Sequence, residues 1–313
     1  MTVEIQDWEE GETITRPGLY RGIPLEIYHN DTTLLSGPSV SKSSVKHIAP
    51  PSGSPKRFWQ HFPGNPKRLK KPASREMDFG KAVHAVLLGD EVFQDRFVVM
   101  PTTVEGEPYH GNKTVWRNWF KRMADRGLVV ITQDQVDQIS LMADDARDHP
   151  LVVNGGLNGD VEISMFAKDP ATGIWLKSRP DVRAIDGDYV DVKTASSLDP
   201  DFLERQIGDM GYYLQGAMTK IICDLLGIPF NSFTFFYTLS KDYADSDYRV
   251  LSEEEILVGI ATINYGLKHI RHGLDNGHWP GVSIYSRENI PIRMNKFDRD
   301  TLLKAIAMDG FRP

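Results

Sequence analysis

The stretch of residues 177–194 alternates apolar and polar side chains, which predicts a β-hairpin that turns at residues 186–188. The apolar residues share one parity: Val182, Ala184, Val190 and Val192. The charged residues occupy the positions between them: Asp181, Arg183, Asp191 and Lys193. Because successive side chains of a strand point to opposite faces, one face of the hairpin belongs to the core and the other gathers charge.

The length of the loop decides which residues of the hairpin face each other. A three-residue loop pairs Arg183 with Asp191 and Asp181 with Lys193, and it keeps the apolar side chains together on the other face. A two-residue loop would place Asp181 opposite Val192 and mix charge with core. We therefore expect the odd loop length.

Apolar spacing along the rest of the chain predicts a mixed α/β protein. Helical periods cover five longer segments and one short one: 78–88, 113–126, 132–148, 199–226, 252–272 and 40–48. Residues 160–168 and 174–176 lead into the hairpin, which predicts a three-stranded antiparallel meander. Residues 129–131 and 232–239 read as further strands, and we expect the second of these to pair with the hairpin. From Gly277 onward the pattern is irregular.

Composition narrows the classes of protein that the chain could be. Hydrophobic residues make up 40% and charged residues 25% of the sequence, as in ordinary globular proteins. The single cysteine, Cys223, excludes a disulfide framework and a four-cysteine metal site. The first residues have neither a basic start nor an apolar run, and no stretch approaches the length of a membrane span. We expect a cytoplasmic protein of a bacterial or phage-infected cell, with no membrane partner.

The charge is unevenly distributed. The whole chain carries −7, yet the segment from Thr32 to Arg75 has no acidic residue and nine lysines and arginines. Phe58, Trp59 and Phe62 lie among these cations, a mixture typical of surfaces that contact phosphates and bases. The alternative is a basic linker, rich in proline and glycine, that is simply solvated.

The charged face of the hairpin has a possible chemistry. Two carboxylates held a few ångströms apart repel each other unless a cation lies between them, and oxygen ligands suit Mg²⁺ or Mn²⁺. The nearby Lys193 could orient a water molecule and offset charge on a phosphate. The alternative is a solvated strand face with surface ion pairs, since an Asp-x-Lys triplet alone is a weak signal.

The order of motifs resembles the PD-(D/E)XK nuclease superfamily, and within it the exonuclease VIII-like (RecE-type) branch of phage recombination nucleases. The matching segments are Ser41–Ser44, Asp78–Leu88, Val161–Glu162, Ser178–Asp181, Val190–Thr194, Gly211–Gln215 and Trp279–Gly281. The resemblance implies a restriction-endonuclease-like core, in which helices flank a mixed central sheet with an antiparallel catalytic hairpin. It also implies a nuclease domain over residues 76–313, preceded by an extension over residues 1–75, the two forming one compact domain.

The resemblance assigns roles to particular residues. The implied ligands of Mg²⁺ or Mn²⁺ are His84, Asp181, Asp191 and the Val192 carbonyl, with Glu162 as a further acidic residue. Lys193 would assist the attacking water. The residues implied to contact DNA or order the site are Arg179, Tyr212 and Gln215. Gln215 would begin a Gln-x-x-x-Tyr motif, but Thr219 replaces the tyrosine. Without the resemblance, His84 would be read as a buried structural histidine.

The function that follows from the resemblance is hydrolysis of DNA from the ends of linear duplexes, in the 5′ to 3′ direction. Its implied partners are a single-strand annealing protein and further copies of the chain in a closed ring. Two alternatives stay open: an endonuclease or single-strand nuclease of the same superfamily, and a DNA-binding subunit without catalysis.

Overall fold

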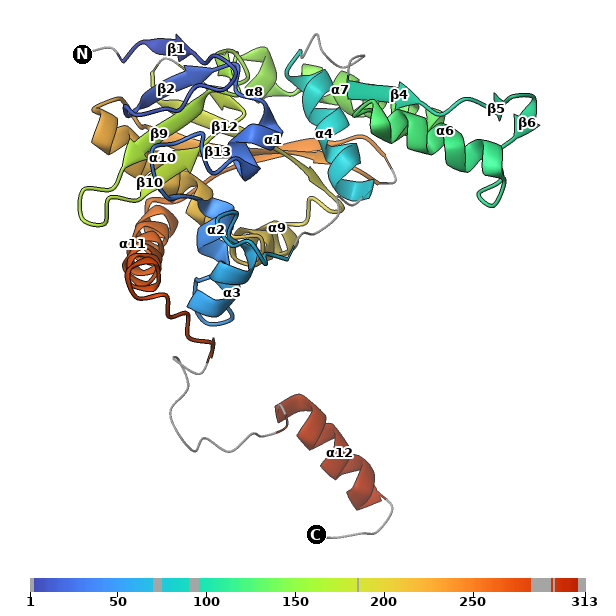
Figure 1. Ribbon diagram of the computed structural model, residues 1–313. Helices are drawn as coiled ribbons and strands as arrows, with labels where there is room; N and C mark the ends of the chain where they lie inside the picture. Colours follow the sequence, from blue (N-terminus) through green and yellow to red (C-terminus); the bar gives the residue numbers. More distant parts are fainter. Residues whose placement is uncertain are drawn as a thin grey trace.

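Two five-stranded mixed sheets form the framework of the protein in the computed structural model (Figure 1). The structure describes residues 3–69, 75–89, 96–184, 186–241, 243–282, 294 and 296–308. Helices alternate with the strands, so the predicted mixed α/β class is confirmed. Within the described residues, no helix is long and apolar enough to cross a membrane.

The first sheet has β9 and β10 at its centre. Its strands, in spatial order, are β1 (Ile5–Asp7), β2 (Gly18–Arg21), β9 (Ser164–Lys168), β10 (Trp175–Ser178) and β3 (Ser39–Ser41). The central pair is antiparallel, whereas β3 runs parallel to β10. Residues before position 42 therefore supply three of the five strands of this sheet.

The second sheet carries the predicted hairpin. Its strands, in spatial order, are β14 (Ser246–Val250), β13 (Ser232–Leu239), β12 (Asp188–Ala195), β11 (Val182–Arg183) and β8 (Asp160–Val161). As predicted, 232–239 pairs with the hairpin, and it does so in parallel to β12 over eight residues. Parallel neighbours need a crossover, which α9 (Pro200–Asp209) and α10 (Tyr213–Leu226) provide.

The register of the hairpin differs from the prediction by two residues. β11 and β12 pair Val182 with Val190 and Arg183 with Tyr189, and the Ala184 N–H donates to the Asp188 carbonyl over 2.9 Å, so three residues lie between this last pair, as expected. Three-residue hairpin loops place a left-handed residue at their third position, and Gly187 takes that place with φ +98°. The shift by an even number leaves the two faces as predicted, but it brings Asp181 alongside Asp191 rather than Lys193.

The predicted antiparallel meander is confirmed in its pairing, since β9 pairs with β10, β8 with β11 and β11 with β12, but its first two strands are divided between the two sheets. The chain leaves the second sheet after β8 and joins the first at β9, and Glu162 between them has φ +51°. On the way back, Pro180 separates β10 from β11 and has no N–H to donate to a continuous ladder. The two strand pairs therefore pass from one sheet to the other, and both turning points lie next to Asp181.

Five of the predicted helices are confirmed as to existence, with shifted ends: α2 (Lys42–Lys46), α4 (Arg75–Leu87), α6 (Thr114–Asp125), α7 (Gln133–Asp148) and α11 (Glu253–Asn276). The single helix predicted over 199–226 is wrong, because Gly211 with φ +66° breaks it into α9 and α10. The irregular end is also corrected, since α12 (Lys296–Met308) forms there, apart from the sheets (Figure 1).

The smaller elements complete the described chain. They are the helices α1 (Leu25–Asn30), α3 (Pro55–His61) and α8 (Pro150–Val153) and the strands β4 (Phe97–Val99), β5 (Thr103–Val104), β6 (Glu107–Pro108) and β7 (Val129–Ile131). β4 pairs in parallel with β7 and confirms the short predicted strand at 129–131. The basic segment contains β3, α2 and α3, so the linker interpretation is wrong for residues 39–61. Lys70 and Lys71 lie outside the described residues.

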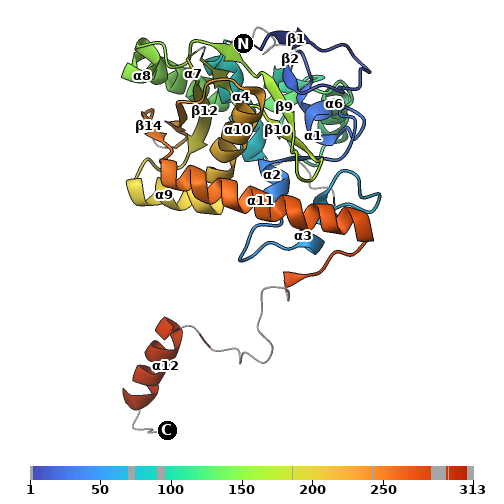
Figure 2. The ribbon, with the colours of Figure 1, turned by 90° about the vertical axis from the view of Figure 1, so that its left-hand side faces the viewer.

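Helix α10 packs against both sheets and is buried on nearly every side. Leu214, Met218 and Ile222 of α10 share one core with Leu176 of the first sheet and Phe235 of the second. α11 crosses the outside of this layer, with α2 and α3 beside it (Figure 2). The predicted apolar face of the hairpin packs on the opposite side, in a separate cluster of Val182, Val190, Val192, Phe236 and Ala146. The polar positions of β12 are thereby left between α4 and α10.

Candidate active site

Asp181 is held at the point where the chain enters β11. Its Oδ2 accepts a hydrogen bond from the main-chain N–H of Val192 over 2.6 Å, and its own carbonyl accepts one from Glu162 over 3.0 Å. The side chain thus binds the neighbouring strand, and Asp181 is only 9% exposed. A carboxylate fixed in this way on two strands cannot turn toward solvent.

Asp191 is the most deeply buried charged residue of the site, with 2% exposure. Its Oδ2 contacts the Lys193 ammonium, and its Oδ1 accepts a hydrogen bond from the Gln215 amide of α10. A buried charge requires such partners, because transfer of an isolated carboxylate from water into the protein interior is very costly. Lys193 lies two residues after Asp191 on β12, so the alternation of the strand places both on one face.

His84 reaches the same cluster from α4. Its Nε2 donates to the Val192 carbonyl oxygen over 2.7 Å, and its Nδ1 lies 3.4 Å from Oδ2 of Asp181. α4 approaches β12 closely at Gly80, where a Cβ atom would lie 3.7 Å from Oγ1 of Thr194. His84 therefore lies with the two carboxylates and Lys193, as the resemblance implies, and not in an apolar core.

The ring of Tyr212 forms one wall of the site. It is stacked on Phe235 with centroids 5.1 Å apart, and Nζ of Lys193 lies 5.1 Å from its centroid. Burial lowers the pKa of Lys193 to about 7, the Lys42 ammonium acts in the same direction, and Asp181 opposes them. Burial also raises the pKa of Tyr212 to about 12. Tyr212 is 8% exposed, so its ring mainly supports the lysines.

The altered Gln-x-x-x-Tyr motif lies on α10, where Gln215 is its first residue and Thr219 replaces the tyrosine. Thr219 is fully buried, and its hydroxyl bonds to Ser178 over 2.7 Å and donates to the Gln215 carbonyl over 3.0 Å. Thr219 therefore ties α10 to β10 from inside the core. Gln215 is 8% exposed, and its Oε1 accepts no hydrogen bond from the described residues.

The remaining two candidates lie beside the cluster. Glu162 follows β8, and its backbone N–H supports Asp181, as described above. Arg179 bonds to Oγ of Ser164 and, over 2.7 Å, to the Ile23 carbonyl, while its guanidinium lies 4.5 Å from the centroid of the Tyr28 ring. Arg179 thus joins N-terminal segments to the first sheet and is not part of the carboxylate cluster.

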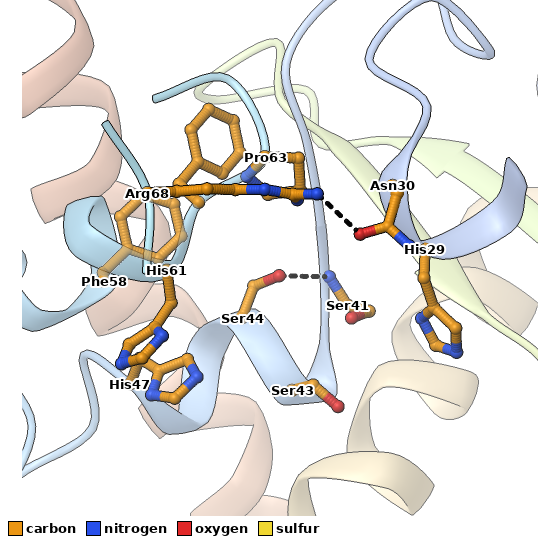
Figure 3. Close-up of a pocket in the computed structure, with 11 residues that line it drawn as sticks. His29, Asn30, Ser41, Ser43, Ser44, His47, Phe58, His61, Pro63 and Arg68 are labelled. Carbon is orange, nitrogen blue, oxygen red and sulfur yellow. Dashed lines mark hydrogen bonds between the residues drawn. The ribbon is translucent and has the colours of Figure 1, made fainter. Parts of the chain in front are cut away.

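A polar pocket lies near this site, on the far side of α2. Its volume is about 140 Å³, and the labelled lining residues come from α1, the end of β3, α2 with the residue after it, α3 and the segment after α3 (Figure 3). Nη2 of Arg68 donates to Oδ1 of Asn30 over 3.0 Å across it, and the rings of His47 and His61 stack at 4.2 Å. The sequence showed that the segment from Thr32 to Arg75 is basic, but it did not predict this pocket.

The chain matches a protein family and resembles a solved structure. The model of the family described as "PDDEXK-like domain of unknown function (DUF3799)" matches residues 41–284. The chain belongs to this family. It is also similar to a crystal structure of a "Putative exonuclease" from Eubacterium rectale, with a TM-score of 0.52 and 14% identity over 84% of this chain and 92% of that one. At that identity the likeness shows a shared fold. No curated protein matches the chain.

A divalent metal ion is the cofactor that a PDDEXK-like fold implies, and the donor atoms of the site fit one. The carboxylates of Asp181 and Asp191 and the Val192 carbonyl are hard oxygen donors of the kind that Mg²⁺ and Mn²⁺ prefer. The orphaned Oε1 of Gln215 lies beside Asp191. In the part of the chain that the structure describes, no three His, Cys, Asp or Glu side chains would hold a metal alone. Main-chain and amide oxygens would therefore complete the set.

Proposed function

We propose that the protein is a metal-dependent DNA exonuclease. The observation that carries the proposal is the convergence of Asp181, Asp191, Lys193 and His84 on one face of β12, in a chain of the PDDEXK-like family. Asp191 and Lys193 lie on β12, whereas Asp181 precedes β11 and His84 lies on α4. A binding module would have no need for two buried carboxylates side by side. The name of the Eubacterium rectale neighbour supports the same reaction class.

The residues divide the work of phosphodiester hydrolysis among them. Asp181, Asp191 and the Val192 carbonyl, with His84, would hold Mg²⁺ or Mn²⁺, which when bound polarises a phosphate and makes a bound water more acidic. Gln215 keeps the Asp191 carboxylate oriented through its amide. Lys193, beside Asp191, orients the attacking water and offsets the charge that develops on the phosphate oxygens. No covalent enzyme intermediate is required.

The substrate and partners that we propose come from the resemblance to RecE-type nucleases. The substrate is linear double-stranded DNA, degraded from its ends in the 5′ to 3′ direction. The remaining strand passes to a single-strand annealing protein for recombination. We further propose a homo-oligomeric ring whose outer surface is acidic and whose channel carries the basic residues of segment 32–75, which is compatible with a chain of net charge −7.

A digestion experiment tests the proposal. A linear duplex and a covalently closed circle are incubated with the wild type or with Lys193→Ala, in Mg²⁺ or in EDTA. We expect loss of the linear duplex alone, abolished by EDTA and by the substitution. Cleavage of the circle would instead indicate an endonuclease. Binding of both DNAs without cleavage, in Mg²⁺ and in Mn²⁺, would replace the proposal with a DNA-binding subunit.

A further inference from the structure

A second lysine faces the site, and the catalytic motif does not include it. Lys42 is the first residue of α2, and its Nζ lies 4.8 Å from the centroid of the Tyr212 ring. Nζ of Lys193, which lies on β12, is 5.1 Å from the centroid of the same ring. Two ammonium groups from distant parts of the sequence therefore converge on one aromatic ring beside the buried carboxylates.

Lys42 and Lys193 differ in their ionic partners. Lys193 contacts Asp191, whereas none of the carboxylates that the structure describes lies within ion-pair distance of Lys42. Burial lowers the pKa of Lys42 to about 8, Lys46 adds to this effect, and Asp181 only partly opposes it. A partly buried cation that no carboxylate contacts is unfavourable, since its charge is only partly compensated. An anionic ligand at this place would remove that cost.

We propose that Lys42 binds a phosphodiester group of the DNA strand that enters the site, next to the phosphate served by Lys193. This inference rests on the proposed nuclease function. A phosphodiester fits because its oxygens accept from ammonium groups and because a DNA strand presents such groups in succession. The Tyr212 ring holds both lysines toward the DNA strand. In this role the buried ring does not itself need to contact DNA.

Lys42→Met tests the proposal, since it keeps most of the length of the side chain and removes the charge. The probe is a fluorescently labelled duplex oligonucleotide, and its dissociation constant is measured by anisotropy in EDTA at several salt concentrations. We expect affinity to fall about tenfold and the salt slope to fall by roughly one. The Tm should stay or rise, because no ion pair is lost. Lys42→Arg should restore most of the affinity.

Lys121→Met is the matched control, because Lys121 is an exposed lysine of α6, outside the basic segment. It should leave affinity and salt slope nearly unchanged. Unchanged binding by Lys42→Met, equal weakening by both variants, or a wild type that binds no duplex would each overturn the proposal. A wild type that binds duplex but cleaves nothing in Mg²⁺ or Mn²⁺ would refute the nuclease function alone, and the binding data would still decide the role of Lys42.

Discussion

Replacing Lys193 by methionine tests how the buried carboxylates of the site are compensated. The substitution keeps the apolar stem against the Tyr212 ring and removes the ammonium group that contacts Asp191. Asp191, with 2% exposure, would then have the Gln215 amide as its remaining polar partner. A neutral amide compensates a buried carboxylate poorly, so we expect the folded state to lose stability.

The expected size of the loss follows from the burial of the two partners. Removing one member of a buried ion pair costs about 3–5 kcal/mol. The lower end, about 3 kcal/mol, applies because the Lys193 side chain is 18% exposed and burial already lowers its pKa to about 7. For a chain of this size that loss corresponds to a Tm about 5 °C lower.

The assay is thermal unfolding in EDTA and in Mg²⁺. A divalent cation at the carboxylates would supply the missing positive charge, so Lys193→Met should gain more Tm from Mg²⁺ than the wild type. Lys220→Met is the control, because it breaks the exposed pair between Lys220 and Asp224 at 2.6 Å and should cost about 0.5 kcal/mol or less. A wild-type Tm for Lys193→Met in EDTA, or equal gains from Mg²⁺, would refute this account of the site.

Two further predictions concern the scaffold. Gly259→Ala places a Cβ atom 2.5 Å from that of Ala217 on α10, so we expect a net loss of about 1–2 kcal/mol after the gain in helix propensity. At Gly208 a Cβ atom would have nothing within 4 Å, so Gly208→Ala should stabilise the protein by up to about 1 kcal/mol. Denaturant unfolding measures both variants, and a Gly259→Ala protein as stable as Gly208→Ala would contradict the packing argument. Burial lowers the pKa of Lys177 to about 8. The unfolded chain keeps that proton up to about pH 10.4, so wild-type stability should rise between these pH values, by about 3 kcal/mol relative to Lys177→Met. An unchanged difference between the two proteins at both ends of that window would show that Lys177 titrates normally.

Local sequence was sufficient for features that depend on neighbouring residues. The alternation of residues 182–193 determined which side chains face the core, because side-chain direction in a strand follows from parity alone. Caps were equally readable: the Thr132 hydroxyl accepts from the Gln135 N–H over 3.2 Å and begins α7, as the spacing predicts. Asp191 and Lys193 share a face for the same local reason.

Features that depend on distant contacts were not readable. The register of the hairpin was misplaced, and Gly187 of its turn packs against the distant Pro229, where a Cβ atom would lie 2.8 Å from backbone. The passage of both strand pairs from one sheet to the other, at Glu162 and Pro180, has no periodic signal. The break at Gly211 lies inside a continuous helical pattern, and only the packing of α10 between two sheets selects it.

The sequence by itself determined that Asp191 and Lys193 share one face, because this follows from the two-residue period of their strand. The tertiary structure decided which other groups join them. His84, Gln215 and Lys42 lie 108, 24 and 151 positions from Val192, Asp191 and Lys193, and they meet them only because α4, α10 and α2 pack around β12. Whether each buried charge has a partner depends on that packing, which is why the position of Lys42, with no ion pair among the described residues, became visible only in the fold.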